Sequence, residues 1–442
     1  TSSTQTAALI YRRLYKATAD LKGLRKRAKV YKSFPILYMR NMYTLILTEK
    51  PSAAKSIAEA LADGKPVKKS NEGERAFWYE FRNNSNKFVC VPAVGHLFTL
   101  KQSDKGWSYP SFNVEWVPSF KASRFAAFSQ PYFRNIETLA KEAKDVIIAT
   151  DYDDEGEVIG YNILKHILGR KDAARMKFST MTKQELLESY ENMIKLNKNL
   201  VESGLARHYL DWYWGINLTR ALTSSIKSAA KRFRILSTGR VQGPVLHMLA
   251  KHEKKIKAFK PKPYWEIELQ LIVGKKSLVA QHAKGKIFDQ SEAKKIHAGL
   301  KGAAAVKSMT TKTMMQKPPK PYNTTSFLAD IYRYFGYSPQ QGLSIAETLY
   351  QAGLISYPRT ASEKLPKDIN YKKIITALGK QKNYEKDSKL LLAKPELKPE
   401  EGAKTDPAHP AIYPTGEIKA IGDKQKKVYD LVVRRFLACF GD

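Results

Sequence analysis

The chain has 442 residues, of which 43% are hydrophobic and 11% aromatic, so it holds enough apolar material for several buried cores and lacks the composition of a disordered protein. Its 76 Lys and Arg residues outnumber its 42 Asp and Glu residues, a net charge of +34 that favours a nucleic-acid partner over a membrane surface. Cys90 and Cys439 are the only cysteines, which disfavours a disulfide framework and a cysteine zinc site. The sequence has no apolar run of membrane-spanning length, which disfavours a membrane protein. We therefore expect a cytoplasmic, nucleoid-associated protein.

The N-terminal part changes character at Tyr43. Residues 1–42 are basic and are expected to form an extension, whereas YTLILTE, from residue 43, is typical of a strand and the following PSAAKSIAEALA has helical periodicity. Two more apolar runs, KFVCVPAVGH (87–96) and DVIIATD (145–151), also end in polar or turn-forming residues. Strands of this type alternating with helices predict a parallel α/β sheet within residues 43–182, with functional groups at the carboxyl ends of its strands.

The rest of the chain is predicted to be helical with a β-rich insertion. Residues 183–260 are helical in pattern and contain the aromatic and basic stretch RHYLDWYWGINLTRAL, whose aromatic side chains suit either base stacking or a buried core. Residues 261–318 alternate like antiparallel strands, and residues 319–442 follow a Pro-rich boundary and end in the helical pattern VYDLVVRRFLACF. The expected fold class is therefore multidomain α/β and α+β.

The densest acidic segment is DYDDEGE, residues 151–157. Carboxylates this close repel one another unless a cation neutralises them, and all-oxygen ligands favour Mg²⁺. An acidic helix start, stabilised by the helix dipole, is the alternative. Glu49 ends a strand of the same predicted sheet, so we expect it to converge with Asp151, Asp153 and Glu155. This combination resembles the Toprim domain of topoisomerases, bacterial-type primases and some nucleases, in which an early Glu and a DxD motif bind magnesium.

A second motif, GLISYPRTAS, contains Tyr357 and Arg359. A guanidinium two residues along an extended X-Pro segment can lie near the same phosphate as the tyrosine. ISYPRT resembles the active-site tyrosine motif of type IA DNA topoisomerases, and further similar stretches are GHL (95–97), FSTMT (178–182), LDWYWGINLTRAL (210–222), STGRVQGPVL (237–246) and AHPAIYPT (408–415). The sequences STGRVQGP and HPAIYPTG are most similar to those of archaeal enzymes of the topoisomerase III kind.

The resemblance implies an incomplete type IA toroid. The basic extension (1–42) would precede a Toprim domain (43–182), the first parts of a helical DNA-binding domain (183–260) and a β-rich arch (261–318), and a tyrosine domain (319–442). Because the family returns after the tyrosine domain to complete the arch, we expect a further C-terminal part, absent from this sequence or supplied by a separate subunit. A helicase partner is not readable from the residues.

The resemblance also implies the roles of individual residues. Tyr357 would attack the DNA and hold the 5′ phosphate, and Glu49, beside Lys50, would protonate the leaving 3′ oxygen. The Mg²⁺ ligands would be Asp151, Asp153, Glu155 and Glu49. Arg359 and His409 would stabilise the phosphate, although His409 could instead be a structural loop residue. The strand-binding groove would include Arg240, Gln242, Arg220, Ser237 and Gly239.

These roles predict an ATP-independent enzyme that cuts and rejoins one DNA strand. Tyrosine has an ordinary pKa near 10, so attack at neutral pH needs nearby positive charge, which Arg359 and His409 would supply. A phosphotyrosyl ester keeps the energy of the broken bond, and the chain has no GxxxxGK[ST] nucleotide loop. The substrate would be single-stranded segments of negatively supercoiled or linked DNA. The alternatives are another Toprim enzyme, a primase or nuclease, and a non-catalytic single-strand binder.

Overall fold

The computed structural model describes residues 42–71, 75–300, 302–366 and 368–442. The predicted basic extension therefore lies outside the described residues except for Met42. The chain forms two compact units: the first contains the residues up to Trp212 and from Lys317 onward, and the second is Tyr213–Gln316. The predicted domain bounds within these units stay predictions.

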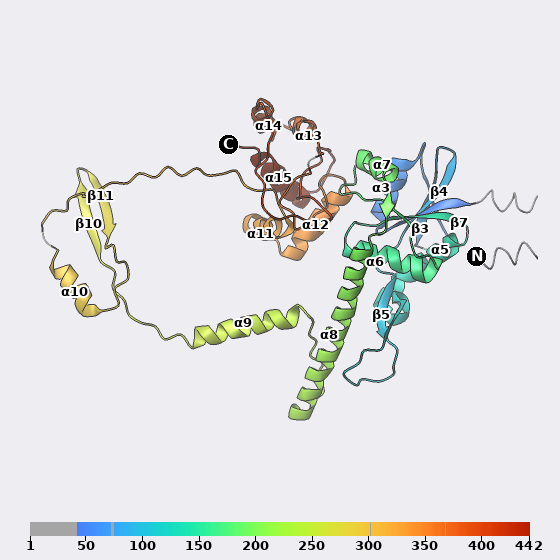
Figure 1. The fold of residues 1–442 in the computed structure, drawn as a ribbon, viewed down its shortest axis with the longest axis horizontal. Helices are drawn as coiled ribbons and strands as arrows, with labels where there is room; N and C mark the ends of the chain where they lie inside the picture. The colour runs from blue at the N-terminus through green and yellow to red at the C-terminus, as the bar shows by residue number, and fades with distance from the viewer. Residues whose placement is uncertain (1–41, 72–74, 301, 367) are drawn as a thin grey trace, which may run out of the picture. The chain divides into compact units, whose positions relative to one another are not determined.

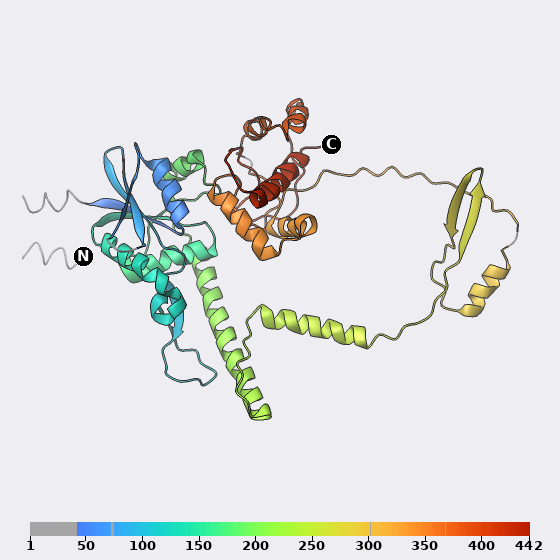
Figure 2. The same ribbon diagram turned by 180° about the vertical axis from the view of Figure 1, so that it is seen from behind.

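The first unit is built on a seven-stranded sheet (Figures 1 and 2). Its strands, in spatial order, are β2 (Val67–Ser70), β3 (Phe77–Asn83), β4 (Asn86–Pro92), β1 (Tyr43–Thr48), β7 (Ala143–Ala149), β8 (Ala174–Arg175) and β9 (Ile194–Lys195). The three strands predicted from their apolar runs are the central neighbours β4, β1 and β7, and both of their pairings are parallel. The predicted parallel sheet is thus confirmed, and these strands end at one common edge.

Helices cover both faces of this sheet, because successive strand residues point to opposite sides. Ile46 of β1 belongs to one buried cluster with Ile57 of the helix after β1, whereas Leu45 belongs to the opposite cluster with Ile136 and Ile159. The elements that complete this part are α3 (Pro51–Leu61), β5 (Phe98–Gln102), β6 (Val114–Pro118), α4 (Ser119–Ala122), the 3₁₀ helix η1 (Arg124–Ser129), α5 (Gln130–Ala140), α6 (Asp154–Ile163), the π-helix η2 (Leu164–Leu168) and α7 (Lys183–Glu191).

The C-terminal part of the first unit is helical, as predicted. It contains α11 (Thr324–Phe335), α12 (Pro339–Gln351), α13 (Tyr371–Leu378), α14 (Glu385–Leu392) and α15 (Asp423–Ala438). Capping boxes begin two of these helices, at Asn323 and at Ser338, which satisfies backbone groups that would otherwise lack partners. The buried Tyr322 and Val432 of this part share one hydrophobic cluster with Phe178 and Met181 near the sheet. The acidic sheet edge and the tyrosine motif therefore belong to one packed body.

The second unit is built from few elements. It contains the C-terminal part of α8 (Lys198–Ala230), α9 (Gln242–Lys257), the strands β10 (Glu268–Val273) and β11 (Lys276–Gln281), and α10 (Gln290–Ala298). The hairpin of β10 and β11 is antiparallel, which confirms the predicted pairing of these runs. No residue of α9 is buried.

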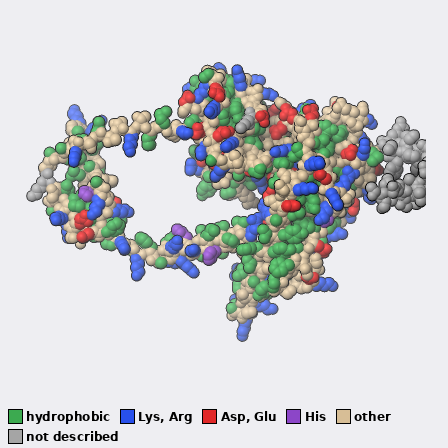
Figure 3. Space-filling model, in the orientation of Figure 1, with side chains coloured by type: hydrophobic (Ala, Val, Ile, Leu, Met, Phe, Trp, Pro, Cys, Tyr) green, Lys and Arg blue, Asp and Glu red, His purple; other side chains and the backbone are tan. Residues whose placement is uncertain are grey.

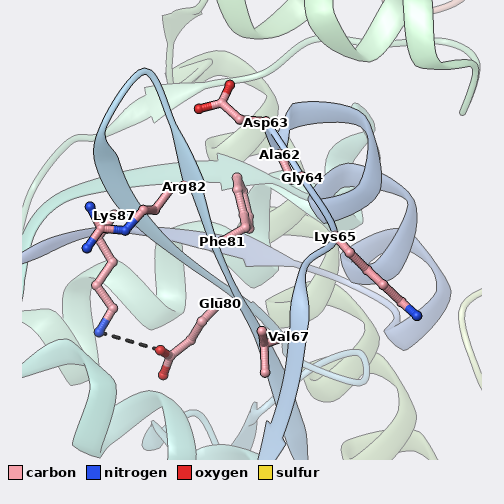
Figure 4. A pocket seen from close by; sticks show the side chains of 9 residues that line it. All are labelled: Ala62, Asp63, Gly64, Lys65, Val67, Glu80, Phe81, Arg82 and Lys87. Atoms are coloured by element: carbon pink, nitrogen blue, oxygen red, sulfur yellow. Dashed lines mark ion pairs between the residues drawn. The ribbon is translucent and has the colours of Figure 1, made fainter.

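The surface carries many basic side chains and a hollow away from the expected site. Lys and Arg side chains are spread over the face shown in Figure 3. A hollow between the end of α3 and strands β2 to β4 is lined by nine residues, including Lys65, Arg82 and Lys87, and none of the nine is a predicted site residue (Figure 4). Among the described helices, none has the length and apolar character that a bilayer crossing requires.

Candidate active site

Tyr357 lies in an extended segment that follows α12. Helix α12 is followed by Gly353, whose φ of +73° is a left-handed conformation that favours glycine. Leu354 and Ile355 are then buried, and the backbone N–H of Tyr357 donates to the carbonyl of Ser179 at 2.8 Å. The tyrosine segment is therefore fastened to the FSTMT segment near the sheet.

The hydroxyl of Tyr357 points at the acidic sheet edge. It donates to Asp153 Oδ2 at 2.6 Å, and only 2% of the residue is exposed. Its ring contacts those of Tyr350 and His409, with centroid distances of 5.1 and 4.4 Å. Burial, followed by the charge of Asp153, raises the pKa of Tyr357 far above its ordinary value. The tyrosine is thus a neutral phenol whose proton is held by a carboxylate.

The carboxylates of this edge come from neighbouring strands. Glu49 follows β1 and Asp151 follows β7, and the last residues of these strands are paired in register. Asp153 caps α6 by accepting a hydrogen bond from the N–H of Gly156 at 2.8 Å. A Cβ at Gly156 would lie 2.0 Å from the carbonyl oxygen of Asp151. The glycine of DYDDEGE is therefore required for the close packing of the acidic turn.

Lys50 provides a positive charge among these carboxylates. Its Nζ lies 2.9 Å from Asp151 Oδ2, 3.0 Å from Glu347 Oε2 and 3.4 Å from Glu49 Oε1. Burial lowers the pKa of Lys50, but the charges of these three carboxylates outweigh that effect and hold the pKa above its ordinary value. The other oxygen of Asp151 accepts a hydrogen bond from the hydroxyl of Tyr350 at 3.0 Å. The lysine therefore stays charged and fixes Asp151.

Glu49 has the properties of a proton donor. Burial, and after it the charge of Asp151, raises its pKa to about 7, although Lys50 opposes the shift. A substantial fraction of Glu49 is therefore protonated near neutral pH, where a general acid works best. The charges of Asp151 and Asp153 contribute to this shift, and carboxylate oxygens are the ligands that a hard divalent cation prefers.

Arg359 contacts the site through Glu347 of α12. Its guanidinium lies 3.2 Å from Glu347 Oε1, while the other oxygen of Glu347 binds Lys50. Half of the Arg359 side chain is exposed, at 52%, so it can turn toward a bound phosphate. Glu347 thereby links the two cations of the site.

His409 lies beside the tyrosine but differs from the expectation in charge. Its Nδ1 is 3.1 Å from the hydroxyl of Ser179, and its ring is nearly fully buried. Burial lowers its pKa to about 4, so His409 is neutral at pH 7 in this structure. The positive charge expected near Tyr357 therefore comes from Lys50 and Arg359, and His409 is placed to hydrogen bond and to pack.

Glu155 lies in a different set of contacts from the other predicted metal ligands. Its Oε2 is 2.7 Å from His96 Nε2 and 3.0 Å from His208 Nε2, and its Oε1 is 3.1 Å from Arg207. Among the described residues, His96, Glu155 and His208 are the only such group of three whose ligand atoms lie within 4.8 Å of one another. Glu155 is thus oriented by two histidines and an arginine, whereas Asp151 faces Lys50 and Asp153 faces Tyr357. The metal-ligand role of Glu49, Asp151, Asp153 and Glu155 stays a prediction.

A buried ion pair holds the backbone of the acidic edge in place. Arg175 and Glu157 are both fully buried, with Arg175 Nε 2.7 Å from Glu157 Oε1. The guanidinium also donates to the carbonyls of Thr150, Asp151 and Met176 at 2.8, 2.8 and 2.6 Å. Arg175 thus fixes the backbone from which the side chain of Asp151 projects.

We predict that Arg175→Met lowers the free energy of unfolding of the first unit by about 3–5 kcal/mol, because it leaves the Glu157 carboxylate buried without its partner. The measurement is the midpoint of urea unfolding followed by circular dichroism. Arg434→Met is the matched control, since that arginine is 58% exposed and pairs with Asp430 one helical turn away, so its effect should stay within about 0.5 kcal/mol. Equal shifts in the two variants would contradict a structural role for the buried pair.

The predicted DNA-binding residues lie in the second unit. The STGR segment runs along α8, where Thr238 N–H donates to the hydroxyl of Thr219 at 3.0 Å and Leu236 N–H to that of Thr223 at 3.2 Å. Within or beside this segment, Ser237 and Gln242 are exposed, Gly239 and Arg240 are half-buried, and Arg220 of α8 is buried. The motif residues are therefore gathered around one stretch of α8 and the start of α9.

Three contact residues were missed from the sequence. Glu347 and Tyr350 lie on α12 in AETLYQ, and Ser179 lies in FSTMT. Glu347 and Tyr350 are three positions apart, so they share a helix face, but nothing in the local sequence marks that face as the one that meets the acidic edge. Ser179 lies in FSTMT, one of the stretches that resemble the family, and this resemblance was the sequence signal that could have identified it.

Comparisons with known proteins agree with this arrangement. The family model for DNA topoisomerase matches residues 195–442, and the Toprim domain model matches residues 44–181. DNA topoisomerase 1 of Pyrococcus horikoshii is 44% identical over 403 residues, which cover 90% of this chain and 58% of that protein. DNA topoisomerase 1 of Methanocaldococcus jannaschii is 43% identical over 407 residues, covering 91% and 52%.

A bacterial protein and a solved structure extend the comparison. DNA topoisomerase 3 of Bacillus licheniformis is 32% identical over 420 residues, covering 89% of this chain and 54% of that protein. Full-length topoisomerase I from Thermotoga maritima has a similar fold, with a TM-score of 0.60 at 24% identity, covering 90% of this chain and 60% of that one. The chain spans a little over half the length of the curated relatives named here. Since the topoisomerase model alone matches more than half of it, the chain belongs to the type IA DNA topoisomerase family, with a Toprim domain, a class of domain that generally binds a divalent metal.

Proposed function

We propose that this chain carries the cleavage and religation centre of an ATP-independent enzyme that transiently cuts one DNA strand. The observation that carries the proposal is the hydrogen bond from Tyr357 to Asp153, which joins a predicted nucleophile to an acidic edge 204 residues away in the chain. Tyr357 has an acceptor for its proton, and Lys50 and Arg359 are the neighbouring cations. Few structural roles need this combination of groups.

In the proposed cleavage step, the Tyr357 oxygen attacks the scissile phosphorus and its proton passes to Asp153 Oδ2. The bond between phosphorus and the 3′ oxygen breaks, and Glu49 gives its proton to that oxygen. Lys50 and Arg359 offset the charge that develops on the phosphate. Religation is the reverse: the 3′ hydroxyl attacks, Glu49 takes back its proton and Asp153 returns one to the phenolate. No nucleotide is consumed, because the phosphotyrosyl ester keeps the bond energy.

We propose Mg²⁺ as the divalent metal, held by Glu49, Asp151, Asp153 and Glu155. The support is the oxygen-donor chemistry of these carboxylates and the raised pKa of Glu49, which burial and then the charges of Asp151 and Asp153 cause. When bound, such a cation supplies charge neutralisation at the phosphate. Lys50 provides part of that neutralisation itself, which suits a cation needed mainly for religation.

The proposed substrate is the single-stranded part of negatively supercoiled or linked DNA. The net charge of +34 supports a polyanionic partner, and the expected groove residues Arg220, Ser237, Gly239, Arg240 and Gln242 lie around α8 and the start of α9. Strand passage, which relaxes or decatenates DNA, is proposed for the whole protein, since the chain spans a little over half the length of its curated relatives.

The decisive experiment is denaturing trapping of the protein on single-stranded DNA labelled at one end or the other. We expect a covalent adduct that carries the label on the 3′ side of the break, because Tyr357 would hold the 5′ phosphate. Free, unattached DNA ends would point to a nuclease, and nucleotide incorporation would point to a primase. Binding without any cut would leave a non-catalytic single-strand protein.

A further inference from the structure

Glu347 of α12 bridges the two cations of the cleavage centre. Its Oε2 lies 3.0 Å from Lys50 Nζ, and its Oε1 lies 3.2 Å from both Nε and Nη2 of Arg359. Each oxygen of the carboxylate therefore faces one of the two cations. The proposed cleavage steps use both cations at the phosphate, but they leave the role of Glu347 open.

The face of α12 that carries Glu347 is fixed against the acidic edge. The hydroxyl of Tyr350 donates to Asp151 Oδ1 at 3.0 Å, and the hydroxyl of Ser52 donates to Gln351 Oε1 at 2.9 Å. Helix positions three and four residues apart lie on one face, so Glu347 shares its face with both of these contacts. Only 17% of the Glu347 side chain is exposed. The packing of α12 therefore holds this carboxylate between the two cations.

A phosphodiester would offer Lys50 and Arg359 the same kind of ligand that Glu347 offers them. Carboxylate and phosphodiester each carry one negative charge over two oxygens bound to a single atom, and ammonium and guanidinium groups bind both anions by charge-assisted hydrogen bonds. In the DNA-free chain these donors are directed at Glu347. A phosphate at the same donors would meet the carboxylate at close range, where two negative charges repel each other. Phosphate and carboxylate therefore exclude each other between these cations.

The two cations differ in how freely they can turn away from Glu347. The side chain of Lys50 is 24% exposed, and its Nζ also lies 2.9 Å from Asp151 Oδ2. The side chain of Arg359 is 52% exposed and pairs with Glu347. Arg359 can therefore turn toward an incoming phosphate, while Lys50 keeps its place beside Asp151.

We propose that Glu347 occupies the place of the scissile phosphate in the DNA-free chain, and that the phosphate displaces it from Lys50 and Arg359 when a strand enters. Glu347 is thus a positioning residue. It keeps the two cations close together and neutralised until DNA arrives, and its return to them favours release of the rejoined strand. No covalent bond changes in this exchange. The inference rests on the proposed function, since it takes these two cations to be the phosphate-binding groups of the cleavage centre.

The test is the salt dependence of binding to labelled oligothymidylate, followed by fluorescence anisotropy in divalent-free buffer, with Tyr357→Phe in every protein so that the strand stays intact. Adding Glu347→Gln keeps the size of the side chain and removes its charge, so binding at low salt should tighten by about fivefold, the factor that one favourable surface ion pair contributes. The slope of log K against log[salt] should steepen by about 0.7. The reason is that a displaced carboxylate takes up a counterion, which offsets one released from the DNA, whereas glutamine takes up none.

Glu385→Gln is the matched control for the loss of one negative charge. Glu385 of α14 pairs with Lys389, and this ion pair shares no residue with the cleavage centre. The control should keep the affinity and the slope of the protein that carries Tyr357→Phe alone. If Glu347 served only to hold the fold together, Glu347→Gln would weaken binding or leave the slope unchanged, and either result would overturn the proposal.

A crystal structure of the Tyr357→Phe protein with bound oligothymidylate tests the exchange without altering Glu347. We expect a phosphate within hydrogen-bond distance of Lys50 Nζ and the Arg359 guanidinium, with the Glu347 carboxylate withdrawn from both. A strand in the cleavage centre while Glu347 still contacts either cation would contradict the proposal. The adduct assay on the native chain is read separately. An adduct together with an unchanged slope rejects this inference alone, whereas absence of any adduct rejects the proposed function.

Discussion

Replacing Tyr357 with phenylalanine is expected to abolish the covalent DNA adduct completely. The change removes only the hydroxyl, which is both the proposed nucleophile and the donor to Asp153. The ring keeps its contacts with Tyr350 and His409, so the fold should survive with a loss of about 1–3 kcal/mol for the missing hydrogen bond to a charged group. The measurement is denaturing gel analysis of labelled single-stranded DNA after incubation with Mg²⁺.

Two comparisons make that result specific. Tyr334→Phe is the matched control, because Tyr334 is 62% exposed on α11 and belongs to the same helical part of the chain, and it should form adduct at the native level. Binding of single-stranded DNA, followed by fluorescence anisotropy, should be retained in both variants. An adduct that persists in Tyr357→Phe would mean that another side chain is the nucleophile.

The central sheet could be predicted because its signal is local. The runs from residues 43, 87 and 145 are short, continuous and apolar, and they form the buried central strands β1, β4 and β7. Parallel strands that are buried on both faces have continuous apolar sequences of this kind. The flanking strands β8 and β9 have two residues each, which is too short for any periodicity to reveal.

The acidic segment shows why residue type alone could not assign roles. Its carboxylates are only one or two residues apart, yet each faces a different partner: Asp151 binds Lys50, Asp153 binds Tyr357 and Glu155 binds His96. Glu157 is buried against Arg175. Glu155 and Glu157 lie in α6, where successive side chains are rotated by about 100°. Asp151 and Asp153 precede the helix, and Asp153 has an extended backbone. The partners of all four carboxylates come from distant segments.

The charge of His409 could not be read from the sequence for a related reason. An imidazole changes protonation within the physiological range when its surroundings change. AHPAIYPT contains polar and turn-forming residues that are typical of an exposed loop, whereas His409 is only 2% exposed. Its neutrality follows from burial by side chains of other segments, including the ring of Tyr357.

Glu49→Gln is expected to reduce DNA cleavage by about 10²–10⁴-fold, the range that a general acid contributes. Glutamine keeps the size of the side chain but has no proton to give to the 3′ oxygen. Because the pKa of Glu49 is raised to about 7, native cleavage should decline as the pH rises above 7, and the variant should lose that decline. The measurement is the rate of adduct formation between pH 6 and about 9 under single-turnover conditions.

The same substitution should stabilise the protein at high pH. This result would distinguish the loss of an ionisable group from a general disruption of the fold. The folded-state pKa of Glu49 is raised above its ordinary value of 4.5. Between these two pKa values the folded chain binds more protons than the unfolded chain, so stability falls as the pH rises. Glutamine removes this penalty, by about 1–3 kcal/mol above pH 7 in a divalent-free buffer. Glu59→Gln, an exposed α3 residue, is the control and should change neither property. A Glu49→Gln protein that is both inactive and less stable at high pH would show that Glu49 serves mainly as a structural partner of Lys50.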